Sequence, residues 1–329
     1  MTKTKKRKCA FGRIVGKIFL GLITFLISVC CLVFVGEKLL FAPFFAQARV
    51  EMKVPGLWEG FVTQGFEKVG EDTYLVSGYD KADKPSSIYV VQGKEQTECE
   101  LFDKDGKASL THAGGVTVFN EFVYVAHGAY CDMYLLSDVL DGDGKATMVD
   151  RAKTANQISF CSVVDGKLYA GAFYREGTQY LTPETHHLTT AAGDKNTALI
   201  MVYTLDETTG KPTSETPEKL YSITSNVQGM CVTASGKIVL STSWGLTPSK
   251  LLVYDETKAQ KTSLTLDGAA YDTTVLDSAC LTQTVTAPPM AEELVYENGR
   301  VIIMCESASM KYLFGKFTSG TWAYSVPIA

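Results

Sequence analysis

Residues 159–174 read SFCSVVDGKLYAGAFY: an apolar run, a turn, and a second apolar run that ends in small and aromatic residues. Short apolar runs bounded by turn residues are typical of buried β-strands. Asp165 and Gly166 separate the two runs, and such dipeptides favour the positive backbone angles of tight hairpins. The stretch therefore predicts two short antiparallel strands.

The same pattern occurs four more times. The other copies are GFEKVGEDTYLVSGY from Gly65, GVTVFNEFVYVAHGAY from Gly115, GMCVTASGKIVLSTSW from Gly229, and ELVYENGRVIIMCES from Glu293. Ser235-Gly236 and Asn298-Gly299 supply further turn dipeptides between paired strands. The sequence thus contains five copies of one hairpin.

Most copies are followed by a third apolar strand and a fourth, more polar one. The third strands are SSIYVV from Ser86, DMYLLS from Asp132, ALIMVYTLD from Ala198 and SKLLVYD from Ser249. The fourth strands are ECELFD from Glu98, EKLYSI from Glu218 and KTSLTL from Lys261. A recurring unit of four strands, with almost no helical periodicity, predicts an all-β fold of repeated four-stranded blades.

In this repeat pattern, residues 58–329 resemble the β-propeller superfamily. The four-strand unit is most similar to lactonase or strictosidine-synthase-like and quinoprotein-like propellers, although no WD dipeptide or kelch double glycine is present. We expect five blades; the alternative is six, with residues 37–57 forming a degenerate blade. A β-sandwich also has alternating strands, but repetition of the same four-strand order argues against it.

Residues 18–35, IFLGLITFLISVCCLVFV, form an uncharged run that would rise about 27 Å as a helix, close to the hydrocarbon thickness of a bilayer. We therefore predict one N-terminal transmembrane helix over residues 18–36. The alternative is a signal peptide cleaved at Ala46-Gln47-Ala48. The run is longer than the usual hydrophobic region of a signal peptide, and Ala46-Gln47-Ala48 lies beyond Glu37. We therefore favour an uncleaved anchor.

Charge orients the predicted anchor. Residues 1–17 carry seven basic residues and no acidic ones; since the whole chain has a net charge of −5, the remainder carries −12. Positive charge resists translocation, so we expect a cytoplasmic head at 1–17, a linker at 37–57, and an extracytoplasmic domain at 58–329 in the cell membrane. The acidic domain disfavours nucleic acid as a partner.

Nine cysteines are present, and six of them follow the apolar run. Several of these six fall inside apolar strand patterns, where a buried free thiol is common. A domain of this size does not need disulfides for stability. We therefore expect isolated core thiols. The six are Cys99, Cys131, Cys161, Cys231, Cys280 and Cys305.

In a propeller, the start of the first strand and the end of the second strand of each blade emerge on the same face. Aligning the copies places Gln64, Gly114, Ile158, Gln228 and Glu292 at one equivalent position, at the entry of strand one. Polar and aromatic side chains gather around that position, as in ligand sites on rigid frames. The candidate ligand-binding residues are His112, His127, Asn156, Asn226, Gln228, Trp244, Glu292 and Glu306.

Each candidate also has a structural alternative. His112 could cap a turn, and Trp244 could serve only as a packing lid. Glu292 and Glu293 are adjacent, so on a regular strand they would face opposite sides. We expect Glu292 to face the channel. Glu306 could pair with Lys311 across a turn.

The sequence lacks the serine-hydrolase elbow, the phosphate-binding loop, the dinucleotide fingerprint and the zinc-protease motif. We therefore expect a binding module for a small molecule, glycan or surface protein. The alternative is a metal-assisted hydrolase, similar to a lactonase or glycosidase. The resemblance to lactonase-type propellers implies that Glu292, Asn156 and Asn226 could hold a calcium ion; no other metal site is predicted, and the identity of any cofactor is left open.

Overall fold

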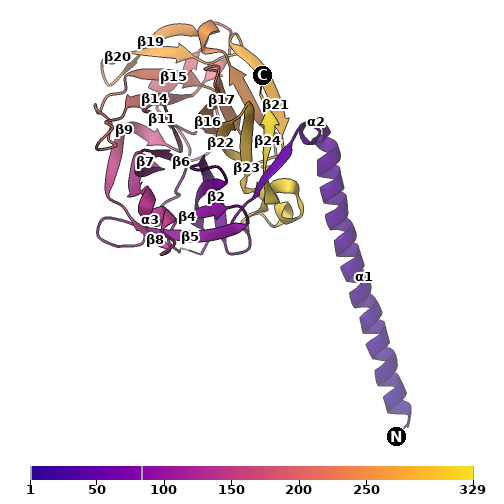
Figure 1. Cartoon of the computed structure of the whole chain (residues 1–329). Helices are drawn as coiled ribbons and strands as arrows, with labels where there is room; N and C mark the ends of the chain where they lie inside the picture. Colours follow the sequence, from indigo (N-terminus) through magenta and orange to yellow (C-terminus); the bar gives the residue numbers. More distant parts are fainter. Residues whose placement is uncertain (1, 83, 329) are drawn as a thin grey trace.

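The computed structural model describes residues 2–82 and 84–328, and the side chains of residues 14–82, 84–312 and 315–328. A long N-terminal helix leads into a ring of β-sheets (Figure 1). Helix α1 spans Thr2–Leu40, and the short helix α2 spans Ala42–Phe45. The basic side chains of the predicted cytoplasmic head, apart from Lys17, lie outside the described side chains.

Within α1, residues Ile14–Leu40 are long and apolar enough to cross a membrane, with a mean hydropathy of 2.9. None of the most apolar window is buried against the ring. An unburied apolar helix near an N-terminus can act as a membrane anchor or as a signal sequence. The apolar helix predicted over residues 18–36 is thus present and continues to Leu40.

Five sheets radiate from a common centre (Figure 1). The first contains β2 (Phe61–Lys68), β3 (Thr73–Asp80), β4 (Ser87–Gln92), β5 (Glu95–Phe102) and β8 (Lys145–Thr147). The second contains β6 (Val116–Phe119), β7 (Phe122–Leu135) and β9 (Asp150–Ile158). The third begins with β10 (Phe160–Val164), β11 (Lys167–Gly171), β14 (Ala198–Thr204) and β15 (Lys219–Ile223).

The fourth and fifth sheets have four strands each. The fourth contains β16 (Val227–Val232), β17 (Ile238–Thr242), β18 (Ser249–Tyr254) and β21 (Leu281–Ala287). The fifth contains β22 (Ala291–Glu297), β23 (Arg300–Cys305), β24 (Trp322–Pro327) and β1 (Arg49–Lys53). Smaller elements in the connections are α3 (Leu136–Leu140), β12 (Leu188–Thr189), β13 (Lys195–Asn196), η1 (Glu184–His186), η2 (Glu256–Lys258), η3 (Glu306–Ala308), η4 (Leu313–Phe317) and η5 (Ser319–Thr321).

The innermost strands form a closed circuit. They contact one another in the order β2, β6, β10, β16 and β22, and β22 returns to β2. An apolar cluster fills each space between neighbouring blades; the one between the first and fifth blades includes Phe66, Val76 and Ile302. The described residues therefore form a five-bladed β-propeller, as the repeat predicts.

The two ends of the chain close the ring together. Strand β1, from the N-terminal side, pairs antiparallel with β24 and becomes the outermost strand of the fifth blade. Residues 37–57, expected to be a linker, thus include the end of α1, α2 and β1. The alternative of a sixth blade from this segment is wrong, because its one strand completes the fifth blade.

The prediction for KTSLTL as the last strand of the fourth blade is also wrong. These residues form β19 (Gln260–Leu266), which turns at Asp267 and Gly268 into β20 (Ala269–Val275). Strand β20 pairs in parallel with β15, so this hairpin extends the third blade. Strand β21 takes the expected place of KTSLTL beside β18. A tight local hairpin with positive φ at both turn residues thus displaced the predicted pairing.

The predicted third strand DMYLLS does not form a separate strand. It continues from the second strand as β7, which is kinked at Gly128, where φ is +60°. The first half of β7 pairs with β6, and the second half pairs with β9. A glycine with positive φ lets one strand change direction and serve two partners.

Glu293 occupies the axis of the ring. Its Oε2 accepts hydrogen bonds from the backbone N–H groups of Phe66 (3.1 Å) and Val116 (2.8 Å), so the fifth blade is tied to the first two. Gly115 and Gly229 leave the room: a Cβ at either position would lie 2.5–2.6 Å from Glu293 atoms. Burial raises the pKa of Glu293 well above its usual range, and the backbone N–H groups of Val116, Phe66 and Cys161 only partly oppose this shift. Burial therefore favours the protonated, uncharged form of this carboxyl group.

The six cysteines of the propeller are buried and free, as the sequence predicts. Burial is the main cause that raises the pKa of the thiols of Cys161, Cys231 and Cys305. These thiols act as small apolar side chains of the core.

We expect Glu293→Ala to lower the free energy of unfolding by about 3–5 kcal/mol, because two buried N–H groups lose their acceptor and a void opens at the axis. Urea denaturation of the full chain in detergent, followed by circular dichroism, measures this loss. Glu95→Ala, on the exposed end of β5, is the matched control. An equal effect of the two substitutions would contradict the role of Glu293 at the axis.

Candidate functional site

A cavity of about 590 Å³ opens at one mouth of the ring. The starts of the inner strands and the ends of the second strands line it, which is the face the sequence predicted. All five residues aligned at the entry of strand one reach this cavity: Gln64, Gly114, Ile158, Gln228 and Glu292. Its volume lies within the range of small-molecule sites.

β-Bulges turn three of these side chains inward. The strand register shifts between Thr63 and Phe66 in β2, between Val227 and Gly229 in β16, and between Ala291 and Leu294 in β22. Each bulge coincides with Gln64, Gln228 or Glu292 and re-aims that side chain. The bulge in β22 also explains why both adjacent glutamates face the axis: Glu292 lines the cavity while Glu293 fills the channel.

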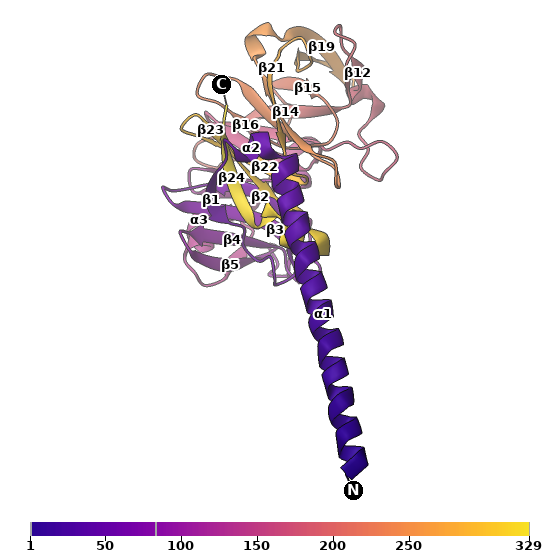
Figure 2. The same cartoon turned by 90° about the vertical axis from the view of Figure 1, so that its right-hand side faces the viewer.

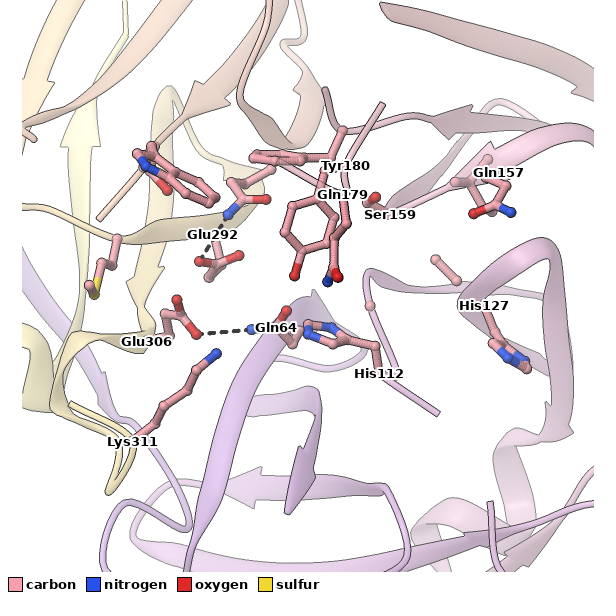
Figure 3. A pocket seen from close by; sticks show the side chains of 18 of the residues that line it. Gln64, His112, His127, Gln157, Ser159, Gln179, Tyr180, Glu292, Glu306 and Lys311 are labelled. Carbon is pink, nitrogen blue, oxygen red and sulfur yellow. Dashed lines mark hydrogen bonds between the residues drawn. The ribbon is translucent and has the colours of Figure 1, made fainter. Parts of the chain in front are cut away.

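Two carboxyl groups form the acidic side of the cavity (Figure 3). Gln228 Nε2 donates to Glu292 Oε1 at 3.3 Å, and Gln64 Nε2 donates to Glu306 Oε2 at 3.2 Å. Tyr312 Oη also donates to Glu306 Oε1 at 2.9 Å. The amides and the phenol thus fix the orientation of both carboxyl groups.

The two carboxyl groups differ in their electrostatics. Burial and the nearby charge of Glu306 raise the pKa of Glu292 well above its ordinary value. Burial also raises the pKa of Glu306, but the charge of Lys311 and the hydrogen bonds from Tyr312 and Gln64 oppose this shift. Glu292 is therefore the member of the pair that more readily carries a proton.

Lys311 and His112 complete this side of the cavity. Lys311 Nζ donates to Tyr79 Oη at 2.6 Å, and the Tyr79 ring lies 4.3 Å from the His112 ring, measured between centroids. Burial by itself would lower the pKa of Lys311. The hydrogen bond to Tyr79 and the charge of Glu306 outweigh this effect, so the pKa of Lys311 is raised. Burial, assisted by the positive charge of Lys311, lowers the pKa of His112 to about 4. Lys311 is thus charged and His112 neutral at pH 7.

Aromatic rings form another wall of the cavity. Phe173 stacks on Trp244 with ring centroids 6.1 Å apart, and Tyr180 meets both rings edge-on. The Arg175 guanidinium lies 5.1 Å from the centroid of the Trp244 ring. Tyr180 and its neighbour Gln179 come from the long insertion between β11 and β14.

His127 and Gln157 lie at the opposite end of the cavity from Glu306 and Lys311 (Figure 3). The Nδ1 atom of His127 is 3.1 Å from Asp132 Oδ2, and Arg151 Nε donates to Asp132 Oδ1 at 2.7 Å. The buried carboxylate of Asp132 therefore orients the imidazole. The cavity thus has polar groups at both ends, which suits an elongated ligand.

Of the eight predicted residues, six line the cavity: His112, His127, Gln228, Trp244, Glu292 and Glu306. Asn156 does not, because it lies within strand β9, where alternate residues face opposite sides and Gln157 takes the inward position. Its Nδ2 atom lies 3.3 Å from Nδ1 of the buried His186. A ligand-binding role for the six remains a prediction.

Asn226 is likewise outside the set of lining residues. Its φ of 60° and that of the equivalent Met290, 64°, place both in the left-handed region just before an inner strand. Asparagine tolerates this conformation better than most residues. Asn226 therefore turns the chain, and its N–H group donates to the Tyr174 carbonyl at 3.0 Å.

The predicted calcium ligands do not converge. Glu292 reaches the cavity, whereas the Asn156 side chain contacts His186 and Asn226 turns the chain ahead of β16. Within the described residues, no group of three or more histidine, cysteine, aspartate and glutamate side chains could hold a metal ion. The donor set that calcium requires is thus not assembled from these three residues.

Lys311 and Tyr312 were missing from the predicted set. They follow the last hairpin in the sequence CESASMKY, where the sequence suggests only that Lys311 could pair with Glu306 across a turn. Phe173, just before the end of its hairpin copy, is also absent from the predicted set although it lines the cavity. Position at the end of a second strand was the signal that could have found it.

No family model matches the sequence, and no curated protein matches it significantly. Among solved structures, the chain is similar to the PQQ-bound aldose sugar dehydrogenase of Streptomyces coelicolor, with 12% identity and a TM-score of 0.49, over 85% of this chain and 97% of that one. It is also similar to BamB from Moraxella catarrhalis, with 8% identity and a TM-score of 0.32, over 81% and 83% of the two chains.

A third similar structure is the bifunctional GH43-CE protein of Bacteroides eggerthii, with 8% identity and a TM-score of 0.34. That match covers 74% of this chain and 31% of the other. At these values the similarities carry no argument about the site. The propeller assignment stands on the ring of sheets itself.

We expect Lys311→Met to raise the pKa of His112 above about 4 while leaving it below its ordinary value, because the charge of Lys311 is removed but burial remains. NMR titration of the histidine ring signals measures this shift. Lys250→Met, an exposed lysine on β18, is the control. An unchanged His112 titration in Lys311→Met would contradict the proximity of the two side chains.

Proposed function

We propose that this protein is a membrane-anchored, extracytoplasmic β-propeller that binds a sugar or the end of a glycan in the cavity at its mouth. One observation carries the proposal: an aromatic wall and a set of fixed amide and carboxyl groups face the same cavity. This combination matches a ligand that presents both C–H faces and hydroxyl groups.

The aromatic wall supplies the apolar half of the recognition. Sugar rings expose C–H groups on one face, and these pack against the π-surface of tryptophan or tyrosine. Trp244 and Tyr180 offer such surfaces, and Arg175 and Phe173 hold the Trp244 ring in place. Rigid aromatic side chains lose little conformational entropy when a ligand binds.

The polar side supplies donors and acceptors for hydroxyl groups. Gln64 and Gln228 each have an amide fixed by a carboxyl partner, which leaves their remaining polar atoms for a ligand. Because Glu292 favours its protonated form and Lys311 offsets Glu306, the net charge of this side is small. A neutral ligand fits these charges better than an ionic one.

The proposed location follows from the N-terminal segment. An apolar helix that begins within a basic sequence favours a cytoplasmic N-terminus and membrane contact through residues 18–36. The acidic remainder then lies on the opposite side of the membrane, where its net charge of −12 does not favour nucleic acid. There the cavity would meet small molecules, glycans or surface proteins.

A glycosidase is the second candidate, and one observation favours it: two carboxyl groups with different environments face one cavity. Glycoside hydrolysis uses such a pair, one as a proton donor and one as a carboxylate. Glu292 would donate the proton to the leaving oxygen, and Glu306 would act as the carboxylate. A metal-assisted lactonase is less supported, since its expected ligands are separated.

We expect Trp244→Ala to weaken binding by about tenfold or more, because the ligand loses its stacking surface. Isothermal titration calorimetry of the full chain in detergent, with a panel of neutral mono- and disaccharides, measures the affinity. Leu246→Ala, at an exposed neighbouring position, should leave it unchanged. If none of these sugars binds the unmodified protein, the proposed ligand class is wrong.

The same sugars distinguish the two candidates. Glu292→Gln keeps the shape of a protonated glutamate, so a binding module should retain most of its affinity. A glycosidase should release sugar products, and Glu292→Gln should abolish their release. Thin-layer chromatography of the sugars after incubation shows which of these occurs.

The proposed topology is tested by cysteine labelling in intact bacterial cells, in a Cys9→Ser background. Asp105→Cys, in an exposed turn of the first blade, should react with a membrane-impermeant maleimide. Thr4→Cys should react only after permeabilisation, and should remain on the same chain if the anchor is uncleaved. The reverse pattern of labelling would place the propeller in the cytoplasm and refute the proposed location.

A further inference from the structure

Three large aromatic side chains are exposed together on the rim of the fifth blade. Trp58, Phe317 and Trp322 have exposed fractions of 68%, 50% and 41%. We call these three residues the rim patch. They come from the segment after β1, from η4, and from the start of β24. None of them lines the cavity at the ring mouth.

Close contacts join the three segments into one surface. The Lys316 ammonium lies 4.2 Å from the centroid of the Trp58 ring and donates a hydrogen bond to the Leu57 carbonyl. Phe317 follows Lys316 directly. The Val54 N–H donates to the Thr321 carbonyl at 3.0 Å, and Lys53 is opposite Trp322 in the β1–β24 pairing.

The rim patch adjoins the apolar helix. Helix α1 contacts η4, the element that carries Phe317. Glu37, near the end of α1, accepts hydrogen bonds from the N–H and hydroxyl groups of Ser319, both at 2.7 Å. Both views place the loop between β23 and β24 beside α1 (Figures 1 and 2). The patch is therefore held close to the point where α1 leaves the ring.

Apolar surface also continues along α1 to this junction. Leu39 and Leu40 have exposed fractions of 72% and 71%, beyond the charged pair Glu37 and Lys38. The exposed helix end and the rim patch thus lie at the same junction between α1 and the fifth blade, which we call the apolar zone. A large exposed apolar zone of this kind marks an interaction site.

The composition of the zone matches a membrane interface. Tryptophan is enriched at the level of the lipid headgroups, where its ring meets the apolar boundary and its N–H group meets water. The exposed Lys53 can lay its stem along apolar surface with its ammonium group in water, whereas the buried Lys316 holds its ammonium group against the Trp58 ring. Glu51 and Glu59 lie nearby in the sequence and offset the positive charge of the lysines. The zone therefore does not depend on attraction to anionic lipids.

We propose that the rim patch rests in the headgroup region of the same membrane that α1 crosses. The inference rests on the proposed function, in which α1 is an uncleaved anchor. Since α1 runs along the plane of the ring and not along its axis (Figures 1 and 2), the propeller then stands on its edge. Its cavity opens parallel to the membrane surface, toward ligands attached to neighbouring surface molecules.

The three tryptophans of the chain provide the test, because Trp58 and Trp322 belong to the rim patch and Trp244 lines the cavity. The full chain is placed in phosphatidylcholine nanodiscs whose acyl chains carry bromine near the headgroup end. In Trp244→Phe, the remaining fluorescence should fall by about a third or more relative to unbrominated lipid, as expected for rings buried roughly 5–10 Å at the interface. In the double variant Trp58→Phe/Trp322→Phe, fluorescence should not change.

Co-elution with the nanodisc on size exclusion separates the two hypotheses. If the chain co-elutes but Trp58 and Trp322 are not quenched, the docking of the rim patch is refuted while the anchor stands. Equal quenching of Trp244 also refutes it, because the cavity would then face the lipid. If the chain does not co-elute, the anchor is refuted, and the docking falls with it.

Discussion

The side chain of Glu293 fills the axis on which the five inner strands converge, and the ring is arranged around that constraint. A carboxyl group at this position can accept the N–H groups of Phe66 and Val116 only if Gly115 and Gly229 leave it room. Burial favours its protonated form, and that form avoids the cost of an unpaired buried charge. Because these bonds run from the fifth blade to the first and second, they act across the closure of the ring, where β22 returns to β2. The Glu293 side chain thereby fills the channel and closes the inner end of the cavity at its mouth.

The segment of β22 that carries Glu293 at the axis also places a polar side chain in the cavity. A bulge in β22 places Glu292 in the cavity next to Glu293 at the axis, and bulges in β2 and β16 place Gln64 and Gln228 beside it. These polar groups are mutually hydrogen-bonded, so their orientation is set before a ligand arrives, and less binding energy is lost in ordering them. The aromatic wall of Trp244, Phe173 and Tyr180 is similarly braced by ring–ring contacts. A rigid site with one apolar and one polar side is what supports recognition of a sugar.

Closure by β1 connects this site mechanically to the N-terminal helix. The strand that completes the fifth blade follows α1 after only a short helical turn, and Phe41 and Phe44 of that turn are buried in the apolar cluster between the fourth and fifth blades. Glu37 adds hydrogen bonds to Ser319. The helix is therefore joined to the ring by packed contacts and not by a flexible tether. A ring fixed in this way keeps a defined orientation relative to any membrane that the helix enters.

The sequence alone determined the five hairpins, the apolar helix, the buried thiols and the face on which Gln64, Gln228 and Glu292 meet. These features depend on local periodicity and on turn residues such as Asp165-Gly166, which involve only residues close together in the sequence. Tertiary structure decided which sheet edge each outer strand joined: β1 completed the last blade, and β19 with β20 extended the third. It also decided that Glu292 and Glu293 both face the axis, and that Gln157 lines the cavity where Asn156 was expected. Edge pairing depends on contacts distant in the chain, and a bulge interrupts the two-residue alternation, so neither can be read from the period of a strand.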